Sequence, residues 1–358
     1  MCGICAVLGI DNTFDILYEG LQILQNRGYD SAGICTINKS NNFVISKYAS
    51  DSISAINKLK HIKNEHVGNN NGIAHTRWAT HGGKTKQNAH PHCDMNNRIS
   101  LVHNGIIENY KHIYNKLVKQ GYKFKSETDT EVIANLIGSF LDKNYSIYEA
   151  IVNATNIMKG TWALVIMFIN EPNKLYLSKN GSPLLVGIGD RNDFVIISSE
   201  QSGFRNRINN YIIIDDNDVI IISKEDGQIK SYATHGKKLT YSPLSDRIMN
   251  SIIYEYIQFT PEPYKHWTIK EIYEQPESVL RVINNGGRIR NNSSVKLGGL
   301  ERIRSKLLKI NHLIILACGT SYNAGLIGKK YMKMLRIFKY VEVINPSEFD
   351  TYDIPNDT

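Results

Sequence analysis

A cysteine directly follows the first methionine, and this position gives Cys2 an unusual chemical setting. Its side chain is small, so Met1 should be removable, which would leave a thiol and a free α-amine on one residue. An α-amine has a pKa near ~8 and can take a proton from the thiol directly or through water. Taken alone, however, Cys2 is better interpreted as the start of a strand than as a nucleophile.

Other residues could assist a thiol that attacks an amide. Asn104 and Gly105 place a side-chain amide beside a flexible backbone N–H, which could hold the oxyanion of a tetrahedral intermediate. Asn-Gly is also the commonest tight-turn dipeptide. Arg77 and Asp129 could bind the carboxylate and the ammonium of a free amino acid, although Asp129 could also cap a helix. Together these residues favour the nucleophile interpretation of Cys2.

The cysteines do not indicate a disulfide framework or a metal site. The chain has five of them: Cys2, Cys5, Cys35, Cys93 and Cys318. Cys2-x-x-Cys5 superficially matches a redox or zinc half-site, but no second close Cys/His pair lies at finger spacing. We therefore expect Cys5 to be a small core residue on the first strand, and we expect no metal and no cofactor.

Composition narrows the class of protein further. The 358 residues are enough for two domains, and 42% of them are hydrophobic. The net charge of +8 comes from scattered Lys and Arg residues without a basic block, so we expect no nucleic-acid partner. No apolar run approaches the roughly 20 residues of a membrane helix, and no leader-like segment opens the chain. We expect a cytoplasmic protein with no membrane partner.

Periodicity predicts both helices and many short strands in the first part of the chain. Apolar runs predict strands over 2–8, 33–37, 43–48, 72–76 and 98–103, the last ending at Asn104-Gly105, and five or six more over 160–222. Helical spacing predicts helices around Ile16–Leu24, Ile53–Ile62, 129–142 and 146–158. This mixture predicts a layered α/β domain over residues 1–224.

The rest of the chain divides into two parts. Residues 225–285 read as a linker, with an amphipathic stretch from Thr268 to Ile283 interrupted by Pro276. Residues 286–358 contain a strand over 312–317, a loop at 318–321, a helix to about 335 and a strand over 340–344. This order is the beginning of a doubly wound α/β domain.

Six segments resemble the class II glutamine amidotransferase domain: Cys2–Ile4, Asn26–Gly33, Ala74–Gly82, Asn88–His92, Val102–Asn109 and Ser126–Val132. The resemblance implies an N-terminal-nucleophile hydrolase fold, an αββα sandwich. It implies Cys2 as the nucleophile and Asn104 and Gly105 as the oxyanion hole. Glutamine would be bound by Arg77, Trp78, Thr80, His81 and Asp129, with Trp78 also gating an ammonia tunnel.

Two later segments, Lys270–Pro276 and Leu316–Asn323, resemble the glutamine–fructose-6-phosphate aminotransferase family. Leu316–Ser321 is similar to the first phosphate loop of a sugar isomerase (SIS) domain. Thr320 and Ser321 would hold the phosphate of fructose 6-phosphate, and the product would be glucosamine 6-phosphate. The family resemblance also suggests a homodimer.

Several features of that family are missing, including its second phosphate loop and its isomerising C-terminal segment. We therefore expect a glutaminase whose synthase half is incomplete. Two alternatives remain. One is a non-catalytic regulatory or assembly subunit that pairs with an intact synthase through residues 268–358. The other is an asparagine- or phosphoribosylamine-forming relative, which would need a different downstream domain.

Overall fold

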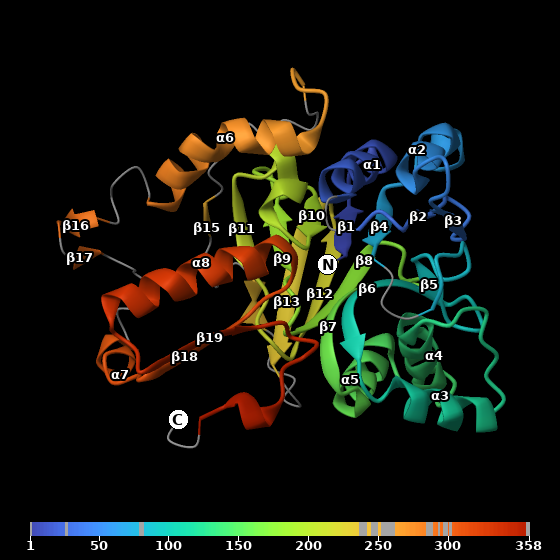
Figure 1. Cartoon of the computed structure of the whole chain (residues 1–358). Coiled ribbons are helices and arrows are strands. Elements are labelled where there is room, and N and C mark those ends of the chain that lie inside the picture. Colours follow the sequence, from blue (N-terminus) through green and yellow to red (C-terminus); the bar gives the residue numbers. More distant parts are fainter. Residues whose placement is uncertain are drawn as a thin grey trace. The chain divides into compact units, whose positions relative to one another are not determined.

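The computed structural model describes residues 2–25, 28–78, 82–235, 242–244, 250–251, 262–283, 289–292, 294–295, 300 and 303–355. The chain divides into two compact units, Met1–Phe259 and Thr260–Thr358. All the residues predicted to act on glutamine belong to the first unit. Figure 1 shows the elements of each unit.

The described strands of the first unit form two antiparallel sheets. One has the order β15-β11-β9-β10-β1-β4-β2-β3, and the other has the order β14-β13-β12-β8-β7-β6-β5. The strands of the first sheet are β1 (Gly3–Leu8), β2 (Ser31–Ile37), β3 (Phe43–Ala49), β4 (Asn71–Arg77), β9 (Leu185–Ile188), β10 (Val195–Ser198), β11 (Asn210–Ile213) and β15 (Asn250–Ser251). Those of the second are β5 (His92–Cys93), β6 (Ile99–Ile107), β7 (Gly160–Phe168), β8 (Lys174–Asn180), β12 (Asp218–Glu225), β13 (Gln228–His235) and β14 (Ser242–Pro243).

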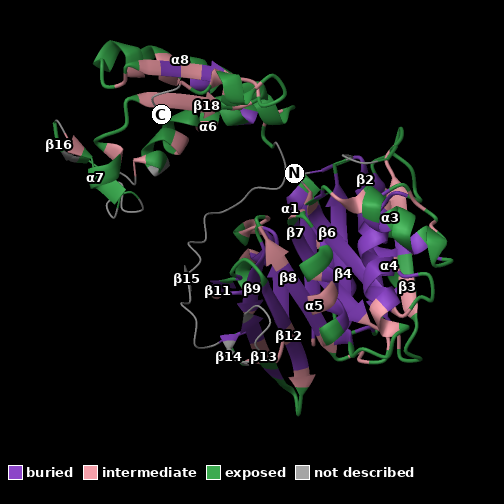
Figure 2. Ribbon diagram, turned by 90° about the horizontal axis from the view of Figure 1, so that it is seen from below, coloured by how far each residue is buried: buried purple, intermediate pink, exposed green. Residues whose placement is uncertain are grey.

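Helices cover the outer faces of both sheets. The first sheet carries α1 (Thr13–Leu24), α2 (Ala55–Leu59) and the 3₁₀ segments η2 (Lys60–Glu65) and η3 (Gln201–Arg207). The second carries α3 (Tyr110–Lys119), α4 (Asp129–Leu141) and α5 (Ile147–Ile157). The result is an αββα sandwich, as the sequence predicted, and Figure 2 shows its central strands as buried.

Strand alternation explains why three separate cores form. Ile4, Ala6 and Leu8 of β1 face the core between the sheets, while Cys5 and Val7 face α1. Because both faces of β1 are covered, its sequence is an uninterrupted run of apolar residues. Cys5 is fully buried, and this burial raises its pKa to about 12. The prediction that Cys5 is a core residue is confirmed.

One local prediction needs correction, and one helix was missed. Asn104-Gly105 does not end a strand, because β6 continues to Ile107 and pairs with β7 as far as Gly160. Gly105 has φ +137°, and a Cβ there would lie 2.1 Å from the Thr161 carbonyl oxygen. A glycine is needed at this position because the neighbouring β7 backbone leaves no room for a side chain, and not because the chain turns there. Also, α3 was not predicted from the sequence.

The segment interpreted as a linker contains regular structure. β13 pairs with β12 along its whole length and contributes Ile229 and Ala233 to the core between the sheets. The first sandwich therefore extends past residue 224. Further on, α6 (Trp267–Val282) continues through Pro276 instead of being interrupted there.

The second unit also contains a parallel strand pair. β18 (His312–Leu316) lies beside β19 (Tyr340–Ile344), and α8 (Gly319–Leu335) connects them. This is the βαβ arrangement predicted from the sequence. The smaller described elements are β16 (Ile289–Asn291), β17 (Ser294–Val295), α7 (Arg304–Leu307) and η6 (Thr351–Asp353). Among the helices of the described residues, none is long and apolar enough to cross a membrane.

Candidate active site

A pocket of the first unit brings together residues that are far apart in sequence. It lies where β1 begins, where β4 ends, along β6 and at the N-terminus of α4. Its lining residues are Cys2, Arg77, Trp78, His90, His103, Gly105, Thr128, Asp129 and Thr130. Four of the predicted site residues therefore share this pocket with Cys2: Arg77, Trp78, Gly105 and Asp129.

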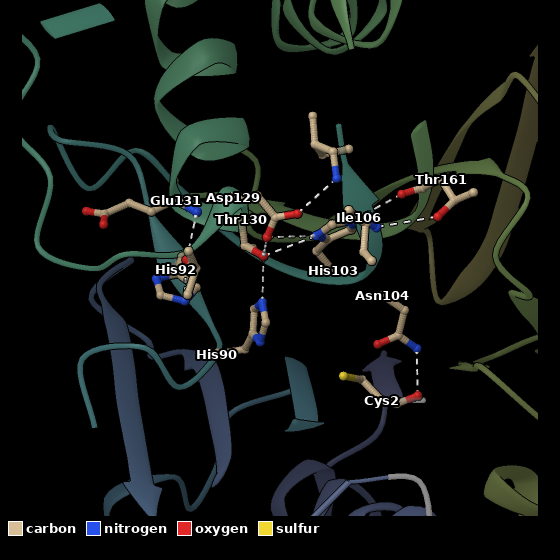
Figure 3. A network of polar contacts seen from close by, with 12 residues as sticks. Cys2, His90, His92, His103, Asn104, Ile106, Asp129, Thr130, Glu131 and Thr161 are labelled. Carbon is tan, nitrogen blue, oxygen red and sulfur yellow. Dashed lines mark hydrogen bonds and ion pairs between the residues drawn. The ribbon is translucent and has the colours of Figure 1, made fainter. Parts of the chain in front are cut away.

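Cys2 is held at both its thiol and its main chain. The Trp78 backbone N–H donates to the Cys2 sulfur over 3.2 Å, and the sulfur lies 3.6 Å from the Trp78 carbonyl oxygen. The Asn104 side-chain nitrogen donates to the Cys2 carbonyl oxygen over 2.9 Å. Figure 3 shows this last bond, with the Cys2 sulfur beside Asn104. The thiol is half-buried, so it is fixed in position yet open to the pocket.

Arg77 is the last residue of β4, and its guanidinium is buried among carbonyl oxygens. It donates to the Gly83 oxygen over 3.2 Å and to the Gly82 oxygen over 3.4 Å. Burial lowers the pKa of Arg77, while the nearby groups of Cys2, Asp30, Asp129 and Glu127 raise it. Arginine has so high a reference pKa that it stays charged. A fixed cation therefore faces the pocket.

A brace of two side chains holds the loop that contacts Arg77. The Glu127 carboxylate accepts from the Gly83 N–H over 3.2 Å and from the Asn88 side chain over 3.0 Å. Asn88 also donates to the Gly83 oxygen over 3.0 Å. These bonds fix the carbonyl group to which Arg77 donates. Asn88 and Glu127 both lie within segments that resemble the family, but no role was predicted for either side chain.

Asp129 is the first residue of α4, and the helix cap is its neighbour. Thr128 is the N-cap, and its hydroxyl accepts from the Glu131 N–H. One Asp129 oxygen accepts from the Ile107 N–H over 3.0 Å. The positive end of the helix dipole favours an ionised carboxylate at this place. The pocket is therefore lined by both a carboxylate and a guanidinium, which suits a zwitterionic amino acid.

Four buried histidines lie at or near the pocket, and two of them, His90 and His103, line it; the other two are His75 and His92. The ring centroids of His75 and His90 are 3.9 Å apart, and those of His90 and His92 are 4.9 Å apart. Burial lowers the pKa of His75 to about 3 and the pKa values of His90 and His92 well below their usual value. The rings of His75, His90 and His92 are therefore neutral at physiological pH. Among the described residues, no group of His, Cys, Asp or Glu is placed to hold a metal ion.

Some predicted site residues lie elsewhere or are not described. Thr80 and His81 fall outside the described residues. Asn104 does not itself line the pocket, but it contacts Cys2 as described above. Thr320 and Ser321 lie in the second unit, in the first turn of α8, where both are exposed.

Comparison with known proteins agrees with this geometry. Residues 75–206 match the family model described as "Glutamine amidotransferase domain". Among solved structures, the chain resembles one titled as the allosteric regulatory enzyme of purine biosynthesis, with a TM-score of 0.55 and 27% identity over 64% of this chain and 48% of that one. It also resembles a glutamine phosphoribosylpyrophosphate amidotransferase from B. subtilis, with a TM-score of 0.56 and 19% identity over 96% of this chain and 81% of that one. Residues 75–206 therefore form a glutamine amidotransferase domain, and the sandwich around it is the N-terminal-nucleophile hydrolase fold of class II amidotransferases.

Within this class, the chain is similar to glutamine–fructose-6-phosphate aminotransferases along nearly its whole length. It is 40% identical to a protein of Acanthamoeba polyphaga mimivirus named a probable isomerizing glutamine–fructose-6-phosphate aminotransferase, over 99% of this chain and 56% of the relative. It is 40% identical to the isomerizing enzyme of that name from Buchnera aphidicola, over 94% of this chain and 53% of the relative. The chain thus spans just over half the length of these curated relatives.

Proposed function

We propose that this chain hydrolyses L-glutamine to glutamate and ammonia, with Cys2 as the nucleophile. The observation that carries the proposal is the pocket in which the Cys2 thiol lies with a buried cation, an anion and a backbone glycine. Arg77 would bind the substrate carboxylate and Asp129 its ammonium, so the side-chain amide of glutamine would reach toward the sulfur.

The reaction proceeds through a thioester. After removal of Met1, the Cys2 α-amine takes the thiol proton, and the sulfur attacks the substrate amide carbon. Asn104 and the Gly105 N–H stabilise the negative oxygen of the tetrahedral intermediate. Its collapse breaks the C–N bond, and the nitrogen leaves with the proton as ammonia. Water then attacks the thioester, which gives glutamate and restores the thiol.

Release of ammonia by the purified full chain tests this proposal. Wild type should convert glutamine to equal amounts of glutamate and ammonia, and Cys2→Ala should abolish both. Cys93→Ala serves as the matched control, because this cysteine lies on β5 outside the pocket lining. Mass spectrometry should find Cys2 as the first residue. Full glutaminase activity in Cys2→Ala would refute the proposal, and it would then favour a non-catalytic assembly role.

We further propose that the ammonia is destined for fructose 6-phosphate, which the names of the relatives specify. The supporting feature is the first turn of α8, which follows β18 and carries Thr320 and Ser321 with the free N–H groups of a helix start. Calorimetric titration of the full chain with fructose 6-phosphate should give a binding signal that Ser321→Ala weakens. Equal affinity of wild type and variant would contradict this assignment.

A further inference from the structure

His75 contacts the Asn104 amide that is proposed to stabilise the oxyanion, yet it does not line the pocket. It lies on β4, while Asn104 lies on β6 of the other sheet. The His75 Nε2 atom is 3.0 Å from the Asn104 side-chain oxygen and 3.0 Å from the His103 carbonyl oxygen. Both His75 and Asn104 are buried, so these bonds form away from water.

The partners of each atom determine where the protons are. The His103 carbonyl oxygen can only accept, so Nε2 must carry a hydrogen. The amide of Asn104 must then turn its oxygen toward His75 and its nitrogen toward the Cys2 carbonyl, which also can only accept. In the flipped orientation, the Asn104 oxygen would face the Cys2 oxygen and its NH₂ group would face the Nε2 hydrogen. One orientation satisfies every group, and the other leaves two repulsive contacts.

The opposite ring nitrogen supports the same assignment. No hydrogen-bond partner for His75 Nδ1 is found among the described residues, and the atom is buried. A hydrogen there would be an unsatisfied buried donor, whereas a lone pair in contact with the His90 ring costs less. His75 is therefore the neutral tautomer with its hydrogen on Nε2.

We infer that His75 is a positioning residue, which fixes the orientation of the Asn104 amide so that its oxygen faces His75 and its NH₂ group faces Cys2. This inference rests on the proposed glutaminase function and deepens it. An amide nitrogen carries two hydrogens, one of which goes to the Cys2 carbonyl oxygen. The second is left for the oxyanion. Without the Nε2 hydrogen, the amide can rotate and present its oxygen to a developing negative charge.

Kinetics of three variants test the inference. His75→Phe, which keeps a ring and removes the donor, should lower kcat for glutamine hydrolysis by about 10- to 100-fold with KM changed less than about threefold. His75→Gln can present an N–H near the Nε2 position and should recover most of kcat. His66→Phe is the matched control: His66 is an equally buried histidine that bonds Thr36 and Ser46 instead. It should lose stability without losing kcat.

A double-mutant cycle separates positioning from a general structural effect. If His75 acts through Asn104, His75→Phe should cost little further kcat in an Asn104→Ala background. Multiplicative losses in the double variant would overturn the inference, as would an unchanged kcat in folded His75→Phe.

The tautomer can be observed independently of catalysis. Long-range ¹H–¹⁵N spectra of the full chain with labelled histidine should show His75 protonated at Nε2, with its resonance assigned by its loss in His75→Gln. A hydrogen on Nδ1 would overturn the inference even in an active protein. A wild-type chain that releases no ammonia would refute the proposed function instead, and the spectrum would still decide the tautomer.

Discussion

At the scale of single residues, the groups proposed to bind glutamine differ from the groups that hold them in place. Arg77 belongs to the first kind, and the Glu127 carboxylate belongs to the second, because it acts on Arg77 through the Gly82–Gly83 loop. The bonds of Asn88 to the same loop and to Glu127 make this brace a small closed network. Removing one member of such a network therefore costs more stabilisation than removing a single hydrogen bond at the surface.

Glu127→Ala should therefore weaken glutamine binding more than it slows chemistry. We expect KM to rise by about tenfold, which corresponds to about 1.4 kcal/mol, and kcat to change little. Glu149→Ala is the matched control, because Glu149 likewise accepts two hydrogen bonds, both from Ser146, but lies in the capping box of α5. Steady-state glutaminase kinetics decide the outcome, and an unchanged KM in Glu127→Ala would contradict the role of the brace.

At the scale of elements, the N-terminus of α4 serves both the fold and the pocket. Its cap, Thr128, accepts from the Glu131 N–H, lines the pocket and contacts the His92 ring over 3.2 Å. The next residue, Asp129, begins the helix and points a carboxylate to the end of β6. The cap therefore sets the position of the proposed ammonium ligand.

Thr128→Ala should lower the free energy of unfolding by about 1 kcal/mol, as expected for loss of a cap, and should also raise KM for glutamine. Ser146→Ala removes the corresponding cap of α5, away from the pocket. It should cost a similar free energy with KM unchanged. Urea unfolding and glutaminase kinetics measure the two effects. Equal KM values in both variants would contradict the prediction that the Thr128 cap positions the glutamine site.

Much at this scale could be predicted from sequence. The helices around 129–142 and 146–158 follow from apolar spacing, and they were confirmed to within one or two residues. β13 was missed because residues 228–235 carry polar residues between isolated apolar ones. The motifs named the candidate site residues, but they did not predict the contacts among them. The His75–Asn104 bond and the Asn88–Glu127 bond join residues 29 and 39 positions apart, and only sheet packing decides such pairings.

At the scale of the whole molecule, the pocket residues described above all come from the first unit. A fragment of residues 1–259 should therefore fold and keep glutaminase activity. A fragment of residues 1–224 should be much less stable, because it loses β13 together with Ile229 and Ala233 from the core between the sheets. Thermal unfolding of the two fragments, with ammonia release, checks this. Equal stability of both would contradict a structural role for β13.

Acid should destabilise the fold through its buried histidines. Burial lowers the pKa of His66 to about 4 and of His75 to about 3, both below the value of 6.5 expected in the unfolded chain. The unfolded chain therefore binds more protons below pH 6.5, and the free energy of unfolding falls as pH decreases from 6.5 toward 4.

Each such histidine contributes a slope of up to about 1.4 kcal/mol per pH unit. Urea unfolding between pH 7.5 and pH 5 measures this, and His66→Phe should make the slope shallower. A free energy of unfolding that does not change between pH 7 and pH 5 would contradict the prediction.

The bond between Asn104 and the Cys2 carbonyl joins two residues 102 positions apart. Cys2 directly precedes β1 of one sheet, and Asn104 lies within β6 of the other. Such a contact closes a long loop, and long loops are closed late because their entropy must be lost first. Regain of catalytic function should thus coincide with the slowest phase of refolding. The recovery of glutaminase activity would then report when one sheet docks against the other. Secondary structure would form earlier.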